Sequence, residues 1–266
     1  MKTTQSLLVL VFLFSITFYS YGQITSISKI NNVKAYSSGG SQNTNATVEK
    51  IDYALWKDLL QKNVSRDGVV NYNGFKKDVV KLNAFLRQVS ATNITSSWSK
   101  SDKIAYWINA YNAYTVKLIL NYLPVNSIKE IDNPWKKSFF SIHNKTMDLS
   151  TIEHEILRKF KDPRIHFAIN CASASCPKLI REPYKAGNLD RLLEQQTTEF
   201  INDPFHNTIS PYTVRVSKIF DWYKKDFKET HGNVVNFINQ YSKSLIADQK
   251  DKGYKEYDWT INSVAY

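Results

Sequence analysis

The sequence predicts an α+β fold in a single domain, with a buried central helix packed on a mixed or antiparallel sheet. The segment 102–122 is apolar on nearly all sides at helical spacing, and beyond its first turn only Lys117 adds a charge. Helical and extended segments alternate along the chain. The extended segments mostly come in pairs joined by short turns, which favours hairpins over parallel strands. The fold of cysteine peptidases and transglutaminases is one candidate in this class.

The first half of the domain is expected to be mainly helical. Amphipathic spacing predicts helices at 53–61 and 75–89. The glycines of DGVVNYNG, residues 67–74, mark turns around a short extended piece. The central helix then runs over 102–122 and ends before Pro124, because proline does not continue a helix.

The second half alternates strands and helices. A hairpin is predicted from strands at 138–143 and 145–149. Ser150 and Glu153 form a capping-box pattern, which predicts a helix that ends at residue 160. The apolar run at 165–171 predicts a strand. The remaining predicted elements are a helix at 189–201, a hairpin of 208–210 with 213–216, helices at 217–227 and 234–244, and a closing strand at 257–262.

The chain begins with the pattern of a secretory signal peptide, residues 1–22. A positive Lys2 precedes an apolar run, and the small residue Gly22 stands at the expected cleavage point. The run falls short of the roughly 20 apolar residues that a membrane helix needs. Residues 23–50 are rich in polar and small residues, which predicts a flexible linker, and 51–266 are predicted to form one globular domain. We therefore expect a secreted or periplasmic protein without a membrane span.

The net charge of +11 does not by itself indicate a nucleic-acid partner. The lysines stand singly or in pairs, and secretion would separate the protein from nucleic acid. A solvated basic surface is the preferred interpretation, and attraction to anionic glycans or envelope surfaces is the alternative. We expect a small-molecule, peptide or glycan ligand and no cofactor.

Two asparagines lie on the predicted central helix. A buried amide without partners costs about 1–3 kcal/mol, so each must form hydrogen bonds. Asn109 is best explained as a residue that holds neighbouring loop backbone. Asn112 lies closer to the main apolar face and is the better candidate for lining a pocket or orienting a catalytic group.

The segment IEHEILR carries three polar candidates. Glu153 has a sufficient structural explanation as the capping partner of Ser150. His154 points away from the centre of the apolar face, with Arg158 one turn further on. A partly exposed histidine more often has no catalytic role, so His154 is of interest mainly because the next motif follows closely.

Alternation along the predicted strand 165–171 separates the histidine from the cysteine. Arg164, His166 and Asn170 would share one face, and Cys171 would lie on the other. His166 and Cys171 meet only if the chain turns near Cys171. The small residues at 172–175 allow such a turn and leave space for a ligand.

Cys171 and Cys176 are the only cysteines in the chain. Their spacing matches neither a common zinc motif nor the thioredoxin motif with two intervening residues. Two alternatives remain: a short-range disulfide, or a free thiol nucleophile beside a structural cysteine. In a secreted protein the disulfide is the more frequent arrangement.

Several segments together resemble one family. WINAYNAYTV, IEHEILR, RIHFAINCASASCPKL and YDWTIN, with the earlier DGVVNY, are similar to the hallmark segments of the domain of unknown function 547 in a secreted bacterial protein. The resemblance runs from Trp56 to Asn262 and implies a widespread domain without an agreed activity. In plant relatives the position of Cys176 need not be cysteine, which weakens an obligatory disulfide and favours Cys171. The positions that the resemblance marks are Asn109, Asn112, Glu153, His154, Arg158, Arg164, His166, Cys171, Ser173 and Pro177.

The leading hypothesis is a cysteine-dependent hydrolase or acyl transferase. Cys171 would be the nucleophile, and His166 or His154 the base. Asn112 or Glu153 would orient that histidine, and backbone amides of residues 172–175 would form an oxyanion hole. Substrate contacts are expected from Asn109, Arg158, Arg164 and Ser173.

Two other classes compete with this hypothesis. One is a non-enzymatic module that binds an envelope peptide or glycan. The other, a metal site of His154, His166 and Cys171, has no support from ligand spacing, and we expect no metal. A histidine nitrogen within hydrogen-bond reach of the Cys171 sulfur would favour the enzyme.

Overall fold

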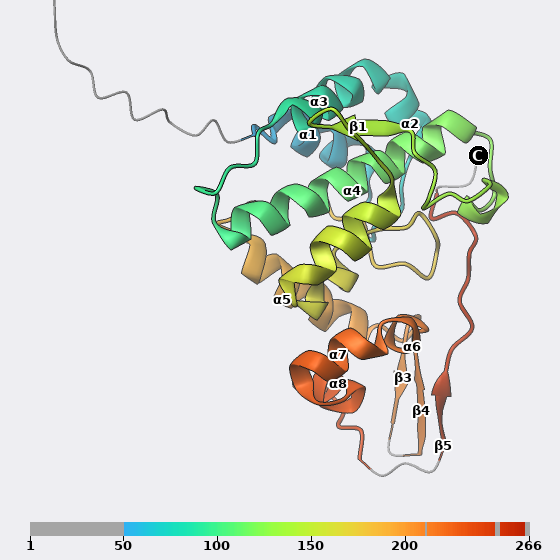
Figure 1. Cartoon of the computed structure of the whole chain (residues 1–266). Helices are drawn as coiled ribbons and strands as arrows, with labels where there is room; N and C mark the ends of the chain where they lie inside the picture. Colours follow the sequence, from blue (N-terminus) through green and yellow to red (C-terminus); the bar gives the residue numbers. More distant parts are fainter. Residues whose placement is uncertain (1–50, 211, 248–250, 264–266) are drawn as a thin grey trace, which may run out of the picture. The chain divides into compact units, whose positions relative to one another are not determined.

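Helix α4 (Lys100–Tyr122) is the centre of the fold in the computed structural model, which describes residues 51–210, 212–247 and 251–263 (Figure 1). These residues belong to one compact unit. Most side chains of α4 are buried on every side of the helix. Ser99 and Asp102 close its first turn with a reciprocal capping box. The predicted α+β class and the buried central helix are confirmed. The predicted signal peptide and linker lie outside the described residues.

Helices α2 (Tyr72–Lys77) and α3 (Val79–Ala91) pack against α4, and the N-terminal helix α1 (Ala54–Asn63) packs against α2 and α3. Two helices therefore stand where one was predicted at 75–89. The break falls at Asp78, whose carboxylate accepts hydrogen bonds from Lys62 (2.8 Å) and Asn63 (3.2 Å). These bonds hold the chain outside helical geometry between α2 and α3.

The predicted hairpin after α4 is confirmed. Strands β1 (Phe140–Ile142) and β2 (Lys145–Met147) pair in antiparallel fashion. His143 and Asn144 between them both have positive φ, as a tight hairpin turn requires. The ring of Phe140 stacks on Tyr114 of α4 with 3.8 Å between ring centroids, which fastens the hairpin to the central helix.

The segment after the hairpin is helical, but not as predicted. Residues Thr151–Ile156 form a π-helix, η2, and Leu157–Phe160 continue as a 3₁₀ helix, η3. The Ser150 side chain makes no capping bond, and Asp148 caps this helix instead by accepting from the Thr151 amide at 2.7 Å. The capping-box interpretation of Glu153 is therefore wrong.

The predicted strand at 165–171 is also wrong. Pro163–Phe167 form a 3₁₀ helix, η4, and residues 168–171 are irregular. Asp162 caps η4 by accepting from the Arg164 amide, and proline suits the first helical position. A short apolar run does not distinguish a buried strand from a buried helical turn. The alternation that separated His166 from Cys171 therefore does not apply.

Helices and a strand of the C-terminal half surround a second group of buried side chains. The predicted helix α5 (Leu189–Asn202) is confirmed, whereas the predicted helix 217–227 is divided into α6 (Ile219–Trp222) and α7 (Lys224–His231). Helix α8 (Val234–Tyr241) follows. The buried aromatic residues of this group include Phe167, Phe200, Phe220, Phe227 and Phe237.

A small mixed sheet lies beside these helices (Figure 1). Strand β4 (Thr213–Val216) pairs antiparallel with β3 (Thr208–Ile209) and parallel with β5 (Asp251–Tyr254). The predicted strand 257–262 instead makes isolated bridges to Ser127 and Ser173, and the bridge to Val70 comes from Ser263. We call residues 257–263 the C-terminal strap. No helix in the described part of the chain is long and apolar enough to cross a membrane.

Candidate functional site

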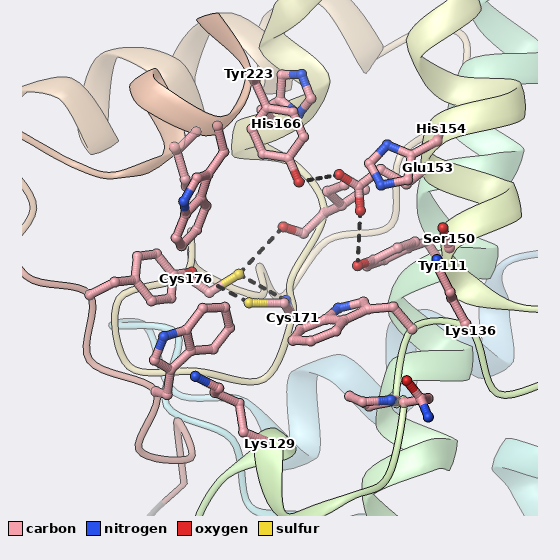
Figure 2. Close-up of a pocket in the computed structure, with 18 of the residues that line it drawn as sticks. Tyr111, Lys129, Lys136, Ser150, Glu153, His154, His166, Cys171, Cys176 and Tyr223 are labelled. Carbon is pink, nitrogen blue, oxygen red and sulfur yellow. Dashed lines mark hydrogen bonds between the residues drawn. The ribbon is translucent and has the colours of Figure 1, made fainter.

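A cavity of about 630 Å³ opens where α4, η2, the loop after η4, α6 and the C-terminal strap meet (Figure 2). This volume lies within the range of pockets for small ligands. The loop 129–136 completes its wall and brings two lysines. The residues that carry the argument below are Tyr111, Glu153, His154, His166, Cys171, Cys176, Tyr223 and Tyr257, and all of them line the cavity.

Two buried asparagines hold the chain that leads into Cys171. Asn112 Oδ1 on α4 accepts from the Asn170 amide at 2.8 Å, and Asn112 Nδ2 donates to the Ala168 carbonyl at 2.9 Å. Asn170 in turn donates to the Pro177 carbonyl at 2.7 Å, across the base of the loop. Asn112 therefore fixes the cysteine loop and does not orient a histidine.

The Cys171 sulfur lies among groups that stabilise a thiolate. Its neighbours are Ser173 Oγ at 3.2 Å and the Tyr257 hydroxyl at 3.4 Å. A hydrogen bond from the Cys176 thiol outweighs burial and, with Ser173 and Tyr257, lowers the pKa of the Cys171 thiol to about 7. Burial raises the pKa of Cys176 well above its usual value. Both cysteines are free, so the predicted disulfide alternative is not the arrangement in this structure.

The backbone amides of the loop are occupied. Those of Ala172, Ala174 and Ser175 donate to the Asn170 side chain and to two carbonyls of the C-terminal strap. The Ser173 amide is directed at the Cys171 sulfur, whose pKa it helps to lower. The expected oxyanion hole of amides from residues 172–175 is therefore wrong, because these donors are already used within the protein.

Neither histidine forms a hydrogen bond with Cys171 in the described residues. His166 is buried; its Nε2 lies 2.9 Å from Asp226 Oδ2, and its ring stacks on Tyr223 with 3.8 Å between ring centroids. His154 is exposed, with Nδ1 3.1 Å from Arg158 Nη1. Figure 2 shows both rings on the side of Glu153 and Tyr223, away from the cysteines. The predicted Cys–His pair is not formed.

Glu153 is a buried carboxylate in the cavity wall. It accepts hydrogen bonds from the hydroxyls of Tyr223 and of Tyr111, the latter at 3.4 Å (Figure 2). Burial, followed by the charge of Glu153, raises the pKa of both phenols well above the usual value. Both phenols therefore remain donors at neutral pH, and they hold the carboxylate in place.

Residues 95–201 match a family model. Its description is "Protein of unknown function, DUF547". No curated protein and no solved structure gives a significant match to the chain. The region matched by DUF547 contains α4, Glu153, both candidate histidines and both cysteines. Helix α6 and the C-terminal strap lie outside it, so Tyr223 and Tyr257 come from parts of the chain beyond the match.

A charged cluster behind the cavity joins the matched region, residues 95–201, to α7. Arg158 donates to both oxygens of Asp226, at 2.7 and 2.6 Å, and His166 binds the same carboxylate. Burial raises the pKa of Asp226, but the hydrogen bonds from Arg158 and His166 outweigh it and bring the pKa well below its usual value. Arg158 therefore anchors α7 and is not among the residues that line the cavity.

Of the other three residues predicted to contact substrate, Ser173 lies at the site, whereas Asn109 and Arg164 stabilise the fold away from it. Asn109 donates to the Tyr184 carbonyl at 2.7 Å and accepts from the Tyr184 amide at 3.1 Å, as its structural interpretation predicted. Arg164 forms ion pairs with carboxylates, among them Asp162 at 2.9 Å. Both residues lie outside the cavity, whereas Ser173 lies directly beside the Cys171 sulfur.

Four residues of the site and its support are not among the sequence-based candidates: Tyr111, Tyr223, Asp226 and Tyr257. The apolar spacing of the central helix explains Tyr111 as a core residue, so nothing in the pattern distinguishes it. Tyr257 belongs to YDWTIN, a segment that carried the resemblance but was interpreted as a strand. Tyr257 and Trp259 are two residues apart, so in an extended segment both rings would lie on one face, and this spacing is the signal that could have indicated a shared site. In the described residues, no group of three His, Cys, Asp or Glu side chains is placed to hold a metal ion.

Proposed function

We propose that this domain is a secreted or periplasmic thiol enzyme that hydrolyses or transfers an acyl group, with Cys171 as the nucleophile. The observation that supports the proposal most is the half-buried Cys171 thiol, with its pKa lowered to about 7, in the wall of a ligand-sized cavity. At neutral pH about half of such a thiol is thiolate, the nucleophilic form. Activation then needs no histidine at the sulfur. A fold like that of cysteine peptidases or transglutaminases stays a prediction.

Tyr257 supplies the acid in this scheme. Its hydroxyl lies 3.4 Å from the Cys171 sulfur and accepts a hydrogen bond from Ser173 Oγ at 3.1 Å. Burial, followed by the charge of Cys171, raises its pKa well above the usual value, so the phenol is protonated when the thiolate attacks. The thiolate adds to the acyl carbon, and the leaving group departs with a proton from Tyr257.

Glu153 supplies the base for the second half of the reaction. Its carboxylate faces the same cavity, held by Tyr111 and Tyr223. Water, or an acceptor hydroxyl or amine, loses its proton to Glu153 and attacks the thioester on Cys171. Cys171 leaves as a thiolate, Glu153 gives up its proton to solvent, and the phenolate of Tyr257 takes up a proton from solvent, which restores the starting state.

An active-ester probe tests this function. With 4-nitrophenyl acetate, the wild-type protein should release a burst of nitrophenolate equal to the protein concentration, followed by slower turnover. Cys171→Ser should lose the burst, and Tyr257→Phe should lower its rate. His231→Ala, which changes a partly exposed histidine on α7 that does not line the cavity, is the matched control. An unchanged burst in Cys171→Ser would exclude Cys171 as the nucleophile.

Four aromatic side chains that line the cavity favour a second candidate function, a binding module for an envelope glycan or peptide. Trp222, Tyr257 and Trp259 lie with ring centroids 4.5–5.7 Å apart, and Trp135 packs edge-on against Trp259. Such surfaces stack on sugar rings and apolar side chains. Tryptophan fluorescence with chitin-derived oligosaccharides and with a mixed peptide pool tests this candidate. Saturable binding that survives Cys171→Ala, in a protein without the ester burst, would favour the module.

A further inference from the structure

We propose that Cys171 and Cys176 form a dithiol that exchanges with small-molecule disulfides, Cys171 as the attacking thiol and Cys176 as the resolving thiol. This activity is distinct from acyl transfer, in which Cys171 is the only cysteine that bonds to the substrate. It gives a covalent role to Cys176, which in the acyl-transfer scheme only donates a hydrogen bond to the Cys171 sulfur.

The two sulfurs are neighbours in one wall of the cavity. The Cys171 amide donates to Cys176 Sγ at 2.8 Å, so the second sulfur lies against the backbone of the residue that it would join (Figure 2). The Cys176 amide donates to the Ser173 carbonyl at 3.1 Å, which turns the chain back toward Cys171. No large movement of the loop is needed to bring the sulfurs together.

The C-terminal strap keeps this loop closed. Ala174 and Ser175 donate their amides to strap carbonyls, and the strap amide of Asp258 donates to Ser175 Oγ at 2.9 Å. Asn170 bonds both the Ala172 amide and the Pro177 carbonyl, on either side of the two cysteines. The cysteines therefore stay adjacent while Cys171 carries a bound group.

The two thiols differ in solvent exposure, and disulfide exchange requires that the attacking thiol be the more exposed one. Cys171 is half-buried and open to the cavity, whereas Cys176 has only 7% of its surface exposed. An external disulfide reaches Cys171 first, and Cys176 then needs to reach only the sulfur beside it. The lowered pKa of Cys171 and the raised pKa of Cys176 agree with these roles, because the thiolate is the attacking form.

Exchange takes place in two balanced steps. The Cys171 thiolate attacks one sulfur of R–S–S–R; a Cys171–S–S–R bond forms, and one RS⁻ leaves. Cys176 then loses its proton and attacks the Cys171 sulfur, so that a Cys171–Cys176 disulfide forms and a second RS⁻ leaves, which takes up the proton. Two protein thiols are oxidised, and one external disulfide is reduced to two thiols.

Cavity size and charge suit a small anionic disulfide. The volume of about 630 Å³ lies within the range of pockets that bind small molecules. Lys129 and Lys136 in the wall offer partners for carboxylates. Oxidised glutathione, which carries carboxylates next to its disulfide, is therefore a suitable probe.

The test is the mass of the reduced full-length secreted chain after incubation with oxidised glutathione. Wild type should become lighter by two hydrogen atoms, keep no glutathione and release two glutathione thiols per protein. Cys176→Ser should retain one glutathione as a stable mixed disulfide. Cys171→Ser should react at least tenfold more slowly, because Cys176 is buried. Stable glutathionylation of wild type, or equally fast reaction of Cys171→Ser, would overturn the proposal.

The same Cys176→Ser variant separates this inference from acyl transfer. It should keep the amplitude of the nitrophenolate burst, since Cys171 remains, with a slower burst at neutral pH because the Cys171 pKa rises without the Cys176 hydrogen bond. It should lose only the ability to release the glutathione that is bound to Cys171. A wild-type protein that gives the burst but stays glutathionylated would refute exchange alone. A protein that completes exchange but gives no burst would refute acyl transfer alone.

Discussion

Asn112 on the central helix and Asn170 in the cysteine loop are joined by a hydrogen bond from the Asn170 amide to Asn112 Oδ1, 2.8 Å long. Both side chains are buried. Asn112 Nδ2 donates to the Ala168 carbonyl. This one polar side chain of α4 therefore satisfies two backbone groups immediately before Cys171, and the position of the sulfur depends on it.

Asn112→Leu should destabilise the domain and displace the thiol. The substitution leaves the Asn170 amide and the Ala168 carbonyl buried without partners, at about 1–3 kcal/mol each. We expect a loss of about 2–4 kcal/mol in the free energy of unfolding, measured in urea, together with a weaker ester burst. Asn112→Asp keeps the acceptor and should lose less. Equal stability and an equal burst in Asn112→Leu would show that the residue only fills space.

Alkylation of Cys171 should follow a thiol pKa near 7. The rate of reaction with iodoacetamide against pH should show its midpoint there in wild type. Cys176→Ser and Tyr257→Phe each remove or weaken a donor to the sulfur, so the midpoint should move up toward the usual value of about 8.5. His154→Ala should leave it unchanged, because His154 forms no hydrogen bond with Cys171. A midpoint that moves with His154 and not with Tyr257 would reverse this assignment.

Local sequence patterns predicted those parts of the fold whose physical causes are local. The apolar periodicity of 102–122 predicted α4 within two residues of its start, and the turn between 138–143 and 145–149 predicted the hairpin. Two of the wrong predictions, the capped helix at Ser150 and the strand at 165–171, concern segments fixed by tertiary contacts. Glu153 has the spacing of a capping residue, but its carboxylate accepts hydrogen bonds from Tyr111 and Tyr223, which lie far from it in the sequence.

The sequence predicted only part of the candidate site, because the remaining residues reach it through tertiary contacts. Cys171 and Glu153 belong to motifs that attract attention by composition. Tyr223 and Tyr257 reach them from positions separated by 70 and 86 residues, respectively. The chain has sixteen tyrosines, and nothing in the sequence distinguishes the two that make these contacts. A single sequence without structural information therefore gives the candidate nucleophile but not its surroundings.

The secreted chain should begin at Gln23. The positive start, the apolar run and the small residue before position 23 predict cleavage after Gly22. Intact-mass and N-terminal analysis of protein from a secreting host measure this directly, with Gly22→Leu as the variant that should slow cleavage. A mature chain that retains residues 7–18 would contradict the assignment and the proposed location.

His206 should make the domain less stable as the pH falls below neutrality. It is buried against Phe200, with 4.2 Å between ring centroids, and burial lowers its pKa to about 4. The unfolded chain takes up the proton near pH 6.5, but the folded chain does not until about pH 4, so stability falls across this window, by about 2–3 kcal/mol. His206→Phe should flatten this part of the curve. Urea unfolding at several pH values tests it, and an unchanged slope would refute the assignment.

Glu153→Gln should separate the two halves of the proposed reaction. The amide keeps the size of the side chain but does not accept a proton, so acylation of Cys171 should proceed while hydrolysis of the thioester slows by about 10²–10⁴-fold. The measured result is a normal nitrophenolate burst with a depressed steady state, and a persistent acyl adduct in the intact mass. Tyr223→Phe, which removes one of the two phenols that hold the carboxylate, should show a smaller effect in the same direction.

Glu155→Gln is the matched control, because Glu155 is exposed on the same helix and pairs with Lys159 at 2.9 Å. If Glu153→Gln and Glu155→Gln turn over equally, the base is another group, and the buried carboxylate serves only to join η2 to α4 and to Tyr223.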